Sequence, residues 1–316
     1  MKKWISISLI CLLAAFASSA CDEFLLGSAR DNVQKTFRVE QGGNLFLDSD
    51  SGSVEVTSEG IDEVRVTVDR EARGATEAEA EQTLKQQRID FRQDGKDVYI
   101  QARRPGGSFF GNSWGNRLQL RFVILVPGRY NLDLKTGGGS IRVNDLEGTV
   151  LARTLGGSLH FGQIKGSVNG HTSGGSITLE GGSGPLDVDT SGGSIRIGKV
   201  YGPVKAHTSG GSISVDEVQG TIEASTSGGS VNATITRQPE GDCELRTSGG
   251  SIRARLRPDL DLNLQAETMG GTVQTDIPVT VQGKISRNRL EAKMNHGGPR
   301  LLLHTLGGSI SINEMP

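Results

Sequence analysis

The sequence has few cysteines and few aromatic residues. It contains three cysteines in 316 residues, and the aromatic residues make up 4% of the chain. Cys11 and Cys21 both belong to the first, apolar part of the chain, which leaves Cys243 without a partner. A small fold stapled by disulfides is therefore excluded, and the protein must be held together by its core and its backbone hydrogen bonds.

An excess of charge of either sign is also missing. The chain has 34 basic and 36 acidic residues, a formal net charge of −2. Loss of Lys2 and Lys3 with a cleaved leader would leave 32 basic residues, so that 32 − 36 gives −4. We therefore expect no nucleic-acid partner, and no electrostatic attraction to an anionic membrane.

The first 20 residues have the pattern of an export signal. Two lysines precede an apolar stretch, residues 4–16, that is too short to span a bilayer comfortably. The run Ser18-Ser-Ala-Cys21 then resembles a bacterial lipobox, which implies a lipid on Cys21. Serine stands where leucine is usual, so cleavage after Ala20 without lipidation is the alternative.

These features predict the course of the N-terminal segment. We expect a signal peptide over residues 1–20 and a lipidated N-terminus with a linker over residues 21–35. The lipid would attach the protein to a membrane of the bacterial cell envelope, facing either the periplasm or the surface.

Glycine, by contrast, is abundant, with 45 residues. A corner motif close to Thr-Ser-Gly-Gly-Ser-Ile begins every 18 residues from Thr136 to Thr226, and begins again at Thr247, Thr268 and Thr305. A short fixed period is typical of a solenoid in which each repeat is one coil. We expect the glycine pairs to form sharp corners that require positive φ. The corner glycines are Gly138, Gly139, Gly156, Gly157, Gly174, Gly175, Gly192, Gly193, Gly210, Gly211, Gly228, Gly229, Gly249 and Gly250.

The residues between corners alternate as strands do. In the unit that begins at Thr190, Ile195 and Ile197 alternate with polar residues, and Val204 and Ala206 repeat the pattern after Gly202-Pro203. The sequence thus predicts an all-β fold, a right-handed parallel β-solenoid with about 18 residues and two short strands per coil. The coils would occupy residues 131–316 and stack in chain order.

Residues 36–130 lack the 18-residue period. They contain several alternating segments, a degenerate corner at residues 49–54, and one helical segment over residues 75–87 that is rich in Ala, Glu and Gln. We interpret this region as a β-rich N-terminal cap with one helix, which shields the first coil.

This arrangement resembles a known bacterial family. A β-rich region, a hydrophobic strand ending at Val126-Pro127, and Leu132-Asp-Leu-Lys-Thr136 leading into serial Ser-Gly-Gly-Ser-Ile corners are similar to the putative-adhesin family. The resemblance covers about residues 36–313. It implies a β-solenoid domain of unknown function found in exported and membrane-attached proteins, and it supplies no catalytic or ligand residues.

Two sets of side chains are candidates for a site. Phe109, Phe110 and Trp114 cluster in a glycine-rich segment and would suit contact with a partner protein or a glycan. His171, Asp189 and His207 would lie in one column of adjacent coils. The outer histidines would be about 9.6 Å apart, so a charge ladder is favoured over a zinc site.

No cofactor, metal site or catalytic set is predicted. The Gly-Gly-Ser corners precede strands rather than helices, which argues against phosphate loops, and a recurring calcium-binding aspartate is missing. The favoured interpretation is a non-enzymatic exported lipoprotein whose solenoid presents a surface for adhesion or for an envelope protein or glycan. The alternatives are a polysaccharide-acting enzyme on one solenoid face and an accessory component of an envelope-sensing system.

Overall fold

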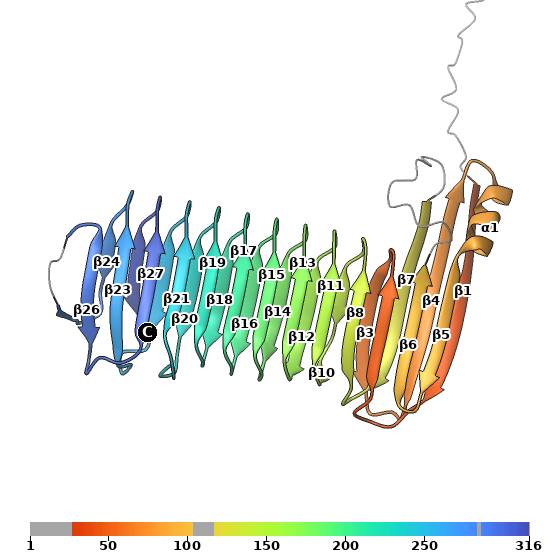
Figure 1. The fold of residues 1–316 in the computed structure, drawn as a ribbon, viewed down its shortest axis with the longest axis horizontal. Helices are drawn as coiled ribbons and strands as arrows, with labels where there is room; N and C mark the ends of the chain where they lie inside the picture. The colour runs from red at the N-terminus through yellow and green to blue at the C-terminus, as the bar shows by residue number, and fades with distance from the viewer. Residues whose placement is uncertain (1–26, 104–116, 283–285, 316) are drawn as a thin grey trace, which may run out of the picture.

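The computed structural model describes residues 27–103, 117–282 and 286–315, which form an elongated stack of strands with one helix at its N-terminal end (Figure 1). The strands make two sheets of 14 strands each, which we call sheet A and sheet B. Successive coils add one strand to each sheet, and these strands pair in parallel. The prediction of an all-β solenoid with two strands per coil is confirmed.

Sheet A begins with strands from the N-terminal region and continues with one strand of each coil. Its strands are β1 (Gly27–Arg38), β3 (Ser53–Glu59), β4 (Glu63–Gly74), β7 (Arg117–Pro127), β9 (Ile141–Val143), β10 (Leu146–Glu147), β12 (Leu159–Lys165), β14 (Ile177–Gly182), β16 (Ile195–Val200), β18 (Ile213–Val218), β20 (Val231–Ile235), β22 (Ile252–Leu256), β24 (Val273–Thr275) and β28 (Ile310–Glu314).

Sheet B is built in the same way from the other strand of each coil. Its strands are β2 (Asn44–Ser49), β5 (Arg88–Asp94), β6 (Asp97–Arg103), β8 (Asn131–Thr136), β11 (Val150–Thr154), β13 (Val168–Thr172), β15 (Leu186–Thr190), β17 (Val204–Thr208), β19 (Ile222–Thr226), β21 (Cys243–Thr247), β23 (Leu262–Thr268), β25 (Thr280–Val281), β26 (Arg289–Met294) and β27 (Arg300–Thr305).

The core lies between the two sheets and consists of stacked apolar columns. In sheet A, Ile177, Ile195 and Ile213 are in register in successive coils, and all three are buried. In sheet B, Val204 is in register with Ile222 in the same way. Along each strand, the residue between two successive buried residues points outward, which is why the sequence alternates with a period of two.

The threonine and serine of each corner hold neighbouring coils together. The Thr208 hydroxyl donates to the carbonyl of Gly193 in the preceding coil (2.8 Å) and accepts from the backbone N–H of Gly211 in its own corner (3.4 Å). The corner serines form a second ladder, in which the N–H of Ser212 donates to Oγ of Ser194 (3.2 Å). All nine corner threonines are buried: Thr136, Thr154, Thr172, Thr190, Thr208, Thr226, Thr247, Thr268 and Thr305.

Thr208→Val should destabilise the protein by about 1–3 kcal/mol, because valine keeps the shape but leaves a partly buried carbonyl and a partly buried N–H without their partner. Thr178→Val is the matched control, since Thr178 lies on the outer face of β14 and is only partly buried. Urea unfolding of both variants measures the difference. Equal midpoints for the two variants would contradict a stabilising role for the buried hydroxyl.

The reason given above for the corner glycines is wrong. Among the described residues, positive φ occurs at other glycines, including Gly148 and Gly166 in the second corner of the first coils, and at no member of the predicted Gly-Gly pairs. The second glycine of each pair is instead required by close stacking. A Cβ on Gly175 would come closer than 3.0 Å to the carbonyl oxygen of Gly157 in the preceding coil.

The last coil does not occupy the last place in the stack. Strand β27 lies between β21 and β23, and β28 lies between β22 and β24. The corner bonds follow the same order, because the Thr305 hydroxyl donates to Gly250 (2.7 Å) and the Thr268 hydroxyl donates to Gly308 (2.6 Å). The expectation of stacking in chain order is therefore wrong at the C-terminal end.

The two sheets also extend to the N-terminal side of residue 131. Strands β2 and β3 flank the predicted degenerate corner, and each pairs in parallel with the first repeat coil, β2 with β8 and β3 with β9. The Thr136 hydroxyl donates to the carbonyl of Gly52 (2.8 Å), as in the regular corners. Residues 44–59 thus form a coil that the 18-residue period does not include.

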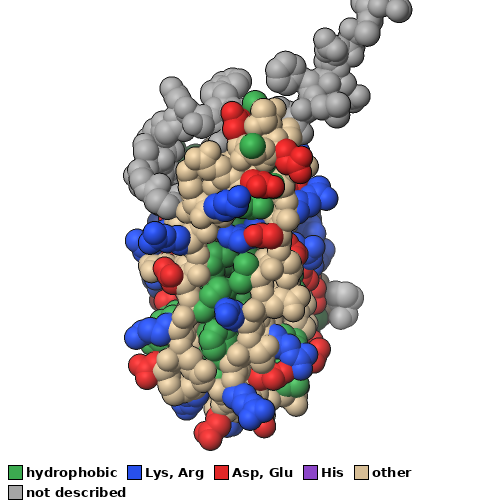
Figure 2. Space-filling model, turned by 90° about the vertical axis from the view of Figure 1, so that its right-hand side faces the viewer, with side chains coloured by type: hydrophobic (Ala, Val, Ile, Leu, Met, Phe, Trp, Pro, Cys, Tyr) green, Lys and Arg blue, Asp and Glu red, His purple; other side chains and the backbone are tan. Residues whose placement is uncertain are grey.

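The remaining N-terminal strands continue both sheets past this coil. Helix α1 (Glu77–Gln86) lies within the expected range, begins after the capping residue Thr76, and buries Ala80 and Leu84. Figure 2 views this end of the molecule and shows apolar side chains between the two sheet edges. Phe37 of β1 and Phe91 of β5 meet there, with ring centroids 6.4 Å apart, and both are only partly buried.

Candidate functional site

Two of the predicted sites lie outside the described residues. Cys21 precedes the first described residue, Gly27, and Phe109, Phe110 and Trp114 fall between Arg103 and Arg117. Lipidation and the aromatic contact surface stay predictions. In the part of the chain that the structure describes, no helix is long and apolar enough to span a bilayer.

The predicted charge column is present on the outer face of sheet B. Arg153, His171, Asp189 and His207 are in register across four strands. Nδ1 of His171 lies 3.0 Å from Oδ1 of Asp189, whereas His207 contacts the hydroxyl of Ser225 (2.7 Å). Across residues 27–103, 117–282 and 286–315, no three His, Cys, Asp or Glu side chains form a group that could hold a metal ion.

Cys243 lies at the start of β21 and points into the core. Its exposed fraction is 1%, and burial raises the pKa of its thiol. A buried thiol with a raised pKa is a poor nucleophile. Cys243 thus acts as a small apolar residue of the core.

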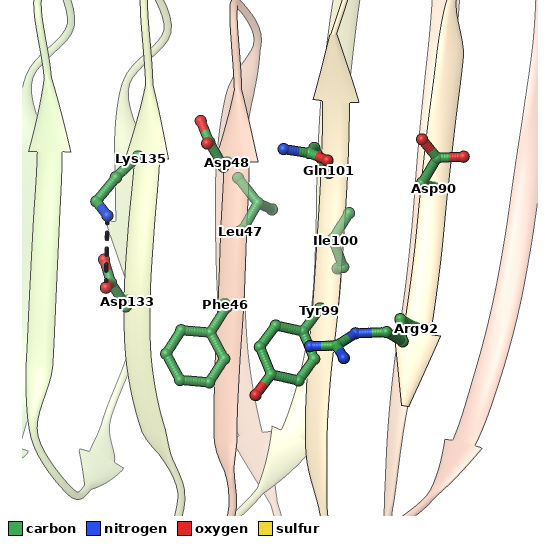
Figure 3. Close-up of a pocket in the computed structure, with 10 residues that line it drawn as sticks. All are labelled: Phe46, Leu47, Asp48, Asp90, Arg92, Tyr99, Ile100, Gln101, Asp133 and Lys135. Atoms are coloured by element: carbon green, nitrogen blue, oxygen red, sulfur yellow. Dashed lines mark ion pairs between the residues drawn. The ribbon is translucent and has the colours of Figure 1, made fainter. Parts of the chain in front are cut away.

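A pocket with binding character lies on the outer face of sheet B, near the N-terminal end of the stack (Figure 3). Its cavity volume is about 330 Å³, and strands β5, β6, β2 and β8 form its floor. The sheet register places its outward side chains in two rows. One row is Arg92, Tyr99, Phe46 and Asp133, and the other is Asp90, Gln101, Asp48 and Lys135.

The first row has an aromatic centre. The rings of Phe46 and Tyr99 are stacked, with centroids 4.7 Å apart and planes at 10°. The guanidinium carbon of Arg92 lies 4.1 Å from the centroid of Tyr99, which is a cation–π contact. Both rings are half-buried, so each stabilises the sheet as a cross-strand pair and still presents apolar surface to the pocket.

Polar groups surround this aromatic pair. Lys135 forms an ion pair with Asp133 (3.6 Å), and Arg103 forms one with Asp48 (2.8 Å). The Oδ1 atom of Asp133 is buried and has no hydrogen-bond donor among the described residues. A buried carboxylate oxygen without a donor is costly, so this atom would gain from a hydroxyl or N–H supplied by a ligand.

The pocket therefore combines a flat apolar surface with carboxylate, amide and cationic groups. This combination suits a sugar ring, whose C–H face packs against an aromatic surface while its hydroxyls donate to carboxylates. Among the residues that the structure describes, no histidine, cysteine or serine lines the pocket. Sequence reasoning missed it because Phe46, Tyr99 and Arg92 lie outside the 18-residue period, and only the register of β2 with β6 and β5 brings them together.

Several solved structures are similar to this chain. One is described as a putative cell adhesion protein from Clostridium sporogenes, with 15% identity, coverage of 90% of this chain and 100% of the other, and a TM-score of 0.24. A putative adhesin from Bacteroides fragilis has 11% identity, coverage of 90% and 97%, and a TM-score of 0.35. A putative lipid binding protein from Parabacteroides distasonis has 12% identity, the same coverages, and a TM-score of 0.37.

No curated protein matches the chain. The family model described as Toastrack DUF4097, in contrast, matches residues 42–313, from just before β2 to the end of β28. This range contains the corner motif and almost all of both sheets, with β1 outside it, and it agrees with the resemblance seen in the sequence. The chain belongs to the Toastrack DUF4097 family.

Proposed function

We propose that the protein is a non-enzymatic component of the bacterial cell envelope, tethered by a lipid on Cys21, that presents its sheet faces for adhesion or partner binding. The pocket around Phe46 and Tyr99 carries this proposal, and its ligand is a sugar ring of a glycan. The aromatic rings supply the contact surface, and Asp133 supplies an acceptor that has no protein donor.

The tether places this pocket close to the membrane. Gly27 is six positions after Cys21, and an extended chain covers at most about 3.6 Å per residue, so the solenoid would begin within about 22 Å of the lipid. The strands under the pocket belong to the same end of the stack. The glycan would accordingly be one of the cell's own envelope. Mass spectrometry of the mature N-terminus should find a diacylglyceryl group on Cys21.

Tyr99→Ala should weaken glycan binding about tenfold, because it removes half of the stacked pair that supports the sugar ring. The binding partner is first identified with an array of envelope oligosaccharides, and affinities are then measured by calorimetry. Tyr201→Ala is the control, since Tyr201 is an exposed tyrosine far along the chain from the pocket.

Three results would contradict the proposal. They are a protein that binds no glycan, equal losses in the two tyrosine variants, and release of new reducing ends from the bound glycan. The last result would favour the polysaccharide-acting enzyme.

A further inference from the structure

The outer face of sheet A differs in charge from the pocket on sheet B. One row of side chains crosses this face from β9 to β28, and the strand register fixes its members. We call it the arginine row. It consists of Arg142, His160, Thr178, Arg196, Ser214, Asn232, Arg253 and Ser311.

From β9 to β28 the arginine row contains no acidic residue, and the next residue in register, Glu55 of β3, forms an ion pair with Arg121 (3.0 Å). Arg142, Arg196 and Arg253 are exposed, and none of the three guanidinium groups has an ion-pair partner among the described residues. The corresponding row on sheet B is different, because Lys205 there pairs with Glu223. A row of cations without carboxylates among them creates a positive local potential, which attracts an anionic ligand.

The spacing of the arginines is regular. Arg196 lies three strands on from Arg142 in the order of the sheet, and Arg253 lies three strands on from Arg196. At about 4.8 Å per strand, successive arginines lie about 14 Å apart. A ligand that contacts all three must therefore be a linear polymer that runs along the solenoid axis, across the strands.

A trough at one end of the row supplies the best-formed part of the surface. Its cavity volume is about 330 Å³, and it lies over β18, β20 and β22. Arg253 and Arg255 form one wall, Asp216 forms the other, and Asn232 with the buried Thr234 lies between them. Neither Arg255 nor Asp216 has an ion-pair partner in the described parts of the chain.

The two walls of the trough favour a ligand that carries both a negative charge and hydrogen-bond donors. The guanidinium groups can hold a carboxylate with charge-assisted hydrogen bonds, whereas Asp216 can only accept. A group with one carboxylate and several hydroxyls satisfies both walls, which describes a uronic acid. A nucleic-acid strand fits less well, because its phosphodiester groups accept hydrogen bonds but cannot donate to the carboxylate of Asp216.

We propose that sheet A binds a linear polysaccharide that carries uronate groups, with one uronate in the trough and the chain extending over Arg196 toward Arg142. This site lies on the other sheet from the pocket around Tyr99, and neither proposal depends on the other. The carboxylate pairs with Arg253 and Arg255, and the sugar hydroxyls donate to Asp216.

The test uses purified protein and polygalacturonate, with affinity measured by calorimetry at low and moderate salt. The polymer should bind, and its affinity should fall as salt rises. Fully methyl-esterified polygalacturonate, which has the same backbone without the charge, should not bind. The double variant Arg253→Gln/Arg255→Gln should lose about tenfold in affinity, since each exposed charge pair contributes about two- to fivefold.

The dependence of affinity on ligand length distinguishes binding in the trough from binding along the whole arginine row. Arg196→Gln should weaken binding of the polymer but not of digalacturonate, because a disaccharide in the trough does not reach a residue about 14 Å away. Arg153→Gln is the matched control, since it removes an exposed arginine from sheet B. Tyr99→Ala should leave polygalacturonate binding unchanged.

Several outcomes would overturn the inference. Equal binding of the methyl ester would show that charge is not recognised, and an equal loss in Arg153→Gln would show that only net charge matters. Single-stranded DNA that binds as tightly as the polymer would exclude the uronate assignment in favour of a polyanion of higher charge density.

Discussion

Gly175→Ala should destabilise the protein by about 3 kcal/mol, whereas Gly174→Ala, one residue earlier in the same corner, should have little effect. A Cβ on Gly175 would come closer than 3.0 Å to the carbonyl oxygen of Gly157, which is backbone of the preceding coil. Relief requires the two coils to separate at that corner, and overpacking of this kind costs about 1–3 kcal/mol or more. A Cβ on Gly174 would meet its nearest atom at 3.6 Å, an ordinary contact.

A third position completes the series. A Cβ on Gly138 would have nothing within 4 Å, so the added methyl group would meet no neighbouring atom. Gly138→Ala should be neutral, or stabilising by about 0.4–1 kcal/mol through the lower entropy of the unfolded chain. The three variants thus share one chemical change and differ in the space that each Cβ meets.

Urea unfolding of the three variants measures this series. When the unfolding free energy depends on urea concentration with the same slope in each variant, the midpoints report differences in stability. The expected order of midpoints is Gly138→Ala at or above the native protein, Gly174→Ala close to it, and Gly175→Ala well below. Equal losses at Gly174 and Gly175 would instead indicate that both glycines are needed for their backbone conformation, which is the explanation that the sequence first suggested.

This comparison shows what the sequence could and could not predict. The spacing of Thr190 and Thr208 predicts the coil, its two strands and the register, because a buried column must repeat at the period of the coil. The reason for the second glycine lies in the distance between backbones of neighbouring coils. That distance depends on how tightly the corners stack, which no local pattern records.

The place of the last coil is unpredictable for a related reason. Each corner offers the same threonine donor and the same glycine carbonyl, so any coil can stack on any other. The corners at Thr268 and Thr305 therefore fit either order. The choice depends on the chain between them, which forms β26, and β26 pairs antiparallel with β23 and occupies its free edge.

The two candidate sites also differ in how far the sequence could predict them. The arginine row lies within the periodic region, and the 18-residue spacing of Thr178, Arg196 and Ser214 could have revealed most of it. The pocket around Tyr99 depends on the pairing of β2 with β6 in the nonperiodic region. Alternation predicts those strands but not which of them are neighbours.

Deletion of residues 300–316 should remove the C-terminal end of the solenoid from the cooperative fold. These residues include β27 and β28, which lie between the coil of β21 and β22 and the coil of β23 and β24. Leu301, Leu303, Ile310 and Ile312 are fully buried in that position. Burial of each of these side chains stabilises the fold by about 1.5–3 kcal/mol. The deletion therefore removes more stabilisation than the terminal coil can restore.

The connection between β22 and β23 opposes a simple closing of the gap. The side chain of Gln238 accepts from the N–H of Asp261 (2.8 Å), and Asn295 donates to the carbonyl of Leu260 (2.7 Å). The connection is thus bonded to the preceding coils on one side and to the turn after β26 on the other. Direct stacking of β23 on β21 would break these bonds.

Deletion of residues 172–189 is the matched control. It removes one whole period from the middle of the stack, and the coils on either side carry the same corner motif and can stack directly. This variant should fold cooperatively, with a modest loss of stability. The C-terminal deletion should instead show early proteolysis within residues 257–299, while the coils up to β22 stay protected.

A peptide of residues 299–316 tests whether the truncated protein lacks only the inserted coil. Added to the truncated protein, it should insert between β21 and β23, pair in parallel with both, and restore protection of residues 257–299. A truncated protein that resists protease and urea as well as the full chain would contradict this prediction, because the two flanking coils would then have closed without loss. The stack would in that case be held by its corners alone, and the position of the last coil would be one of two equivalent arrangements.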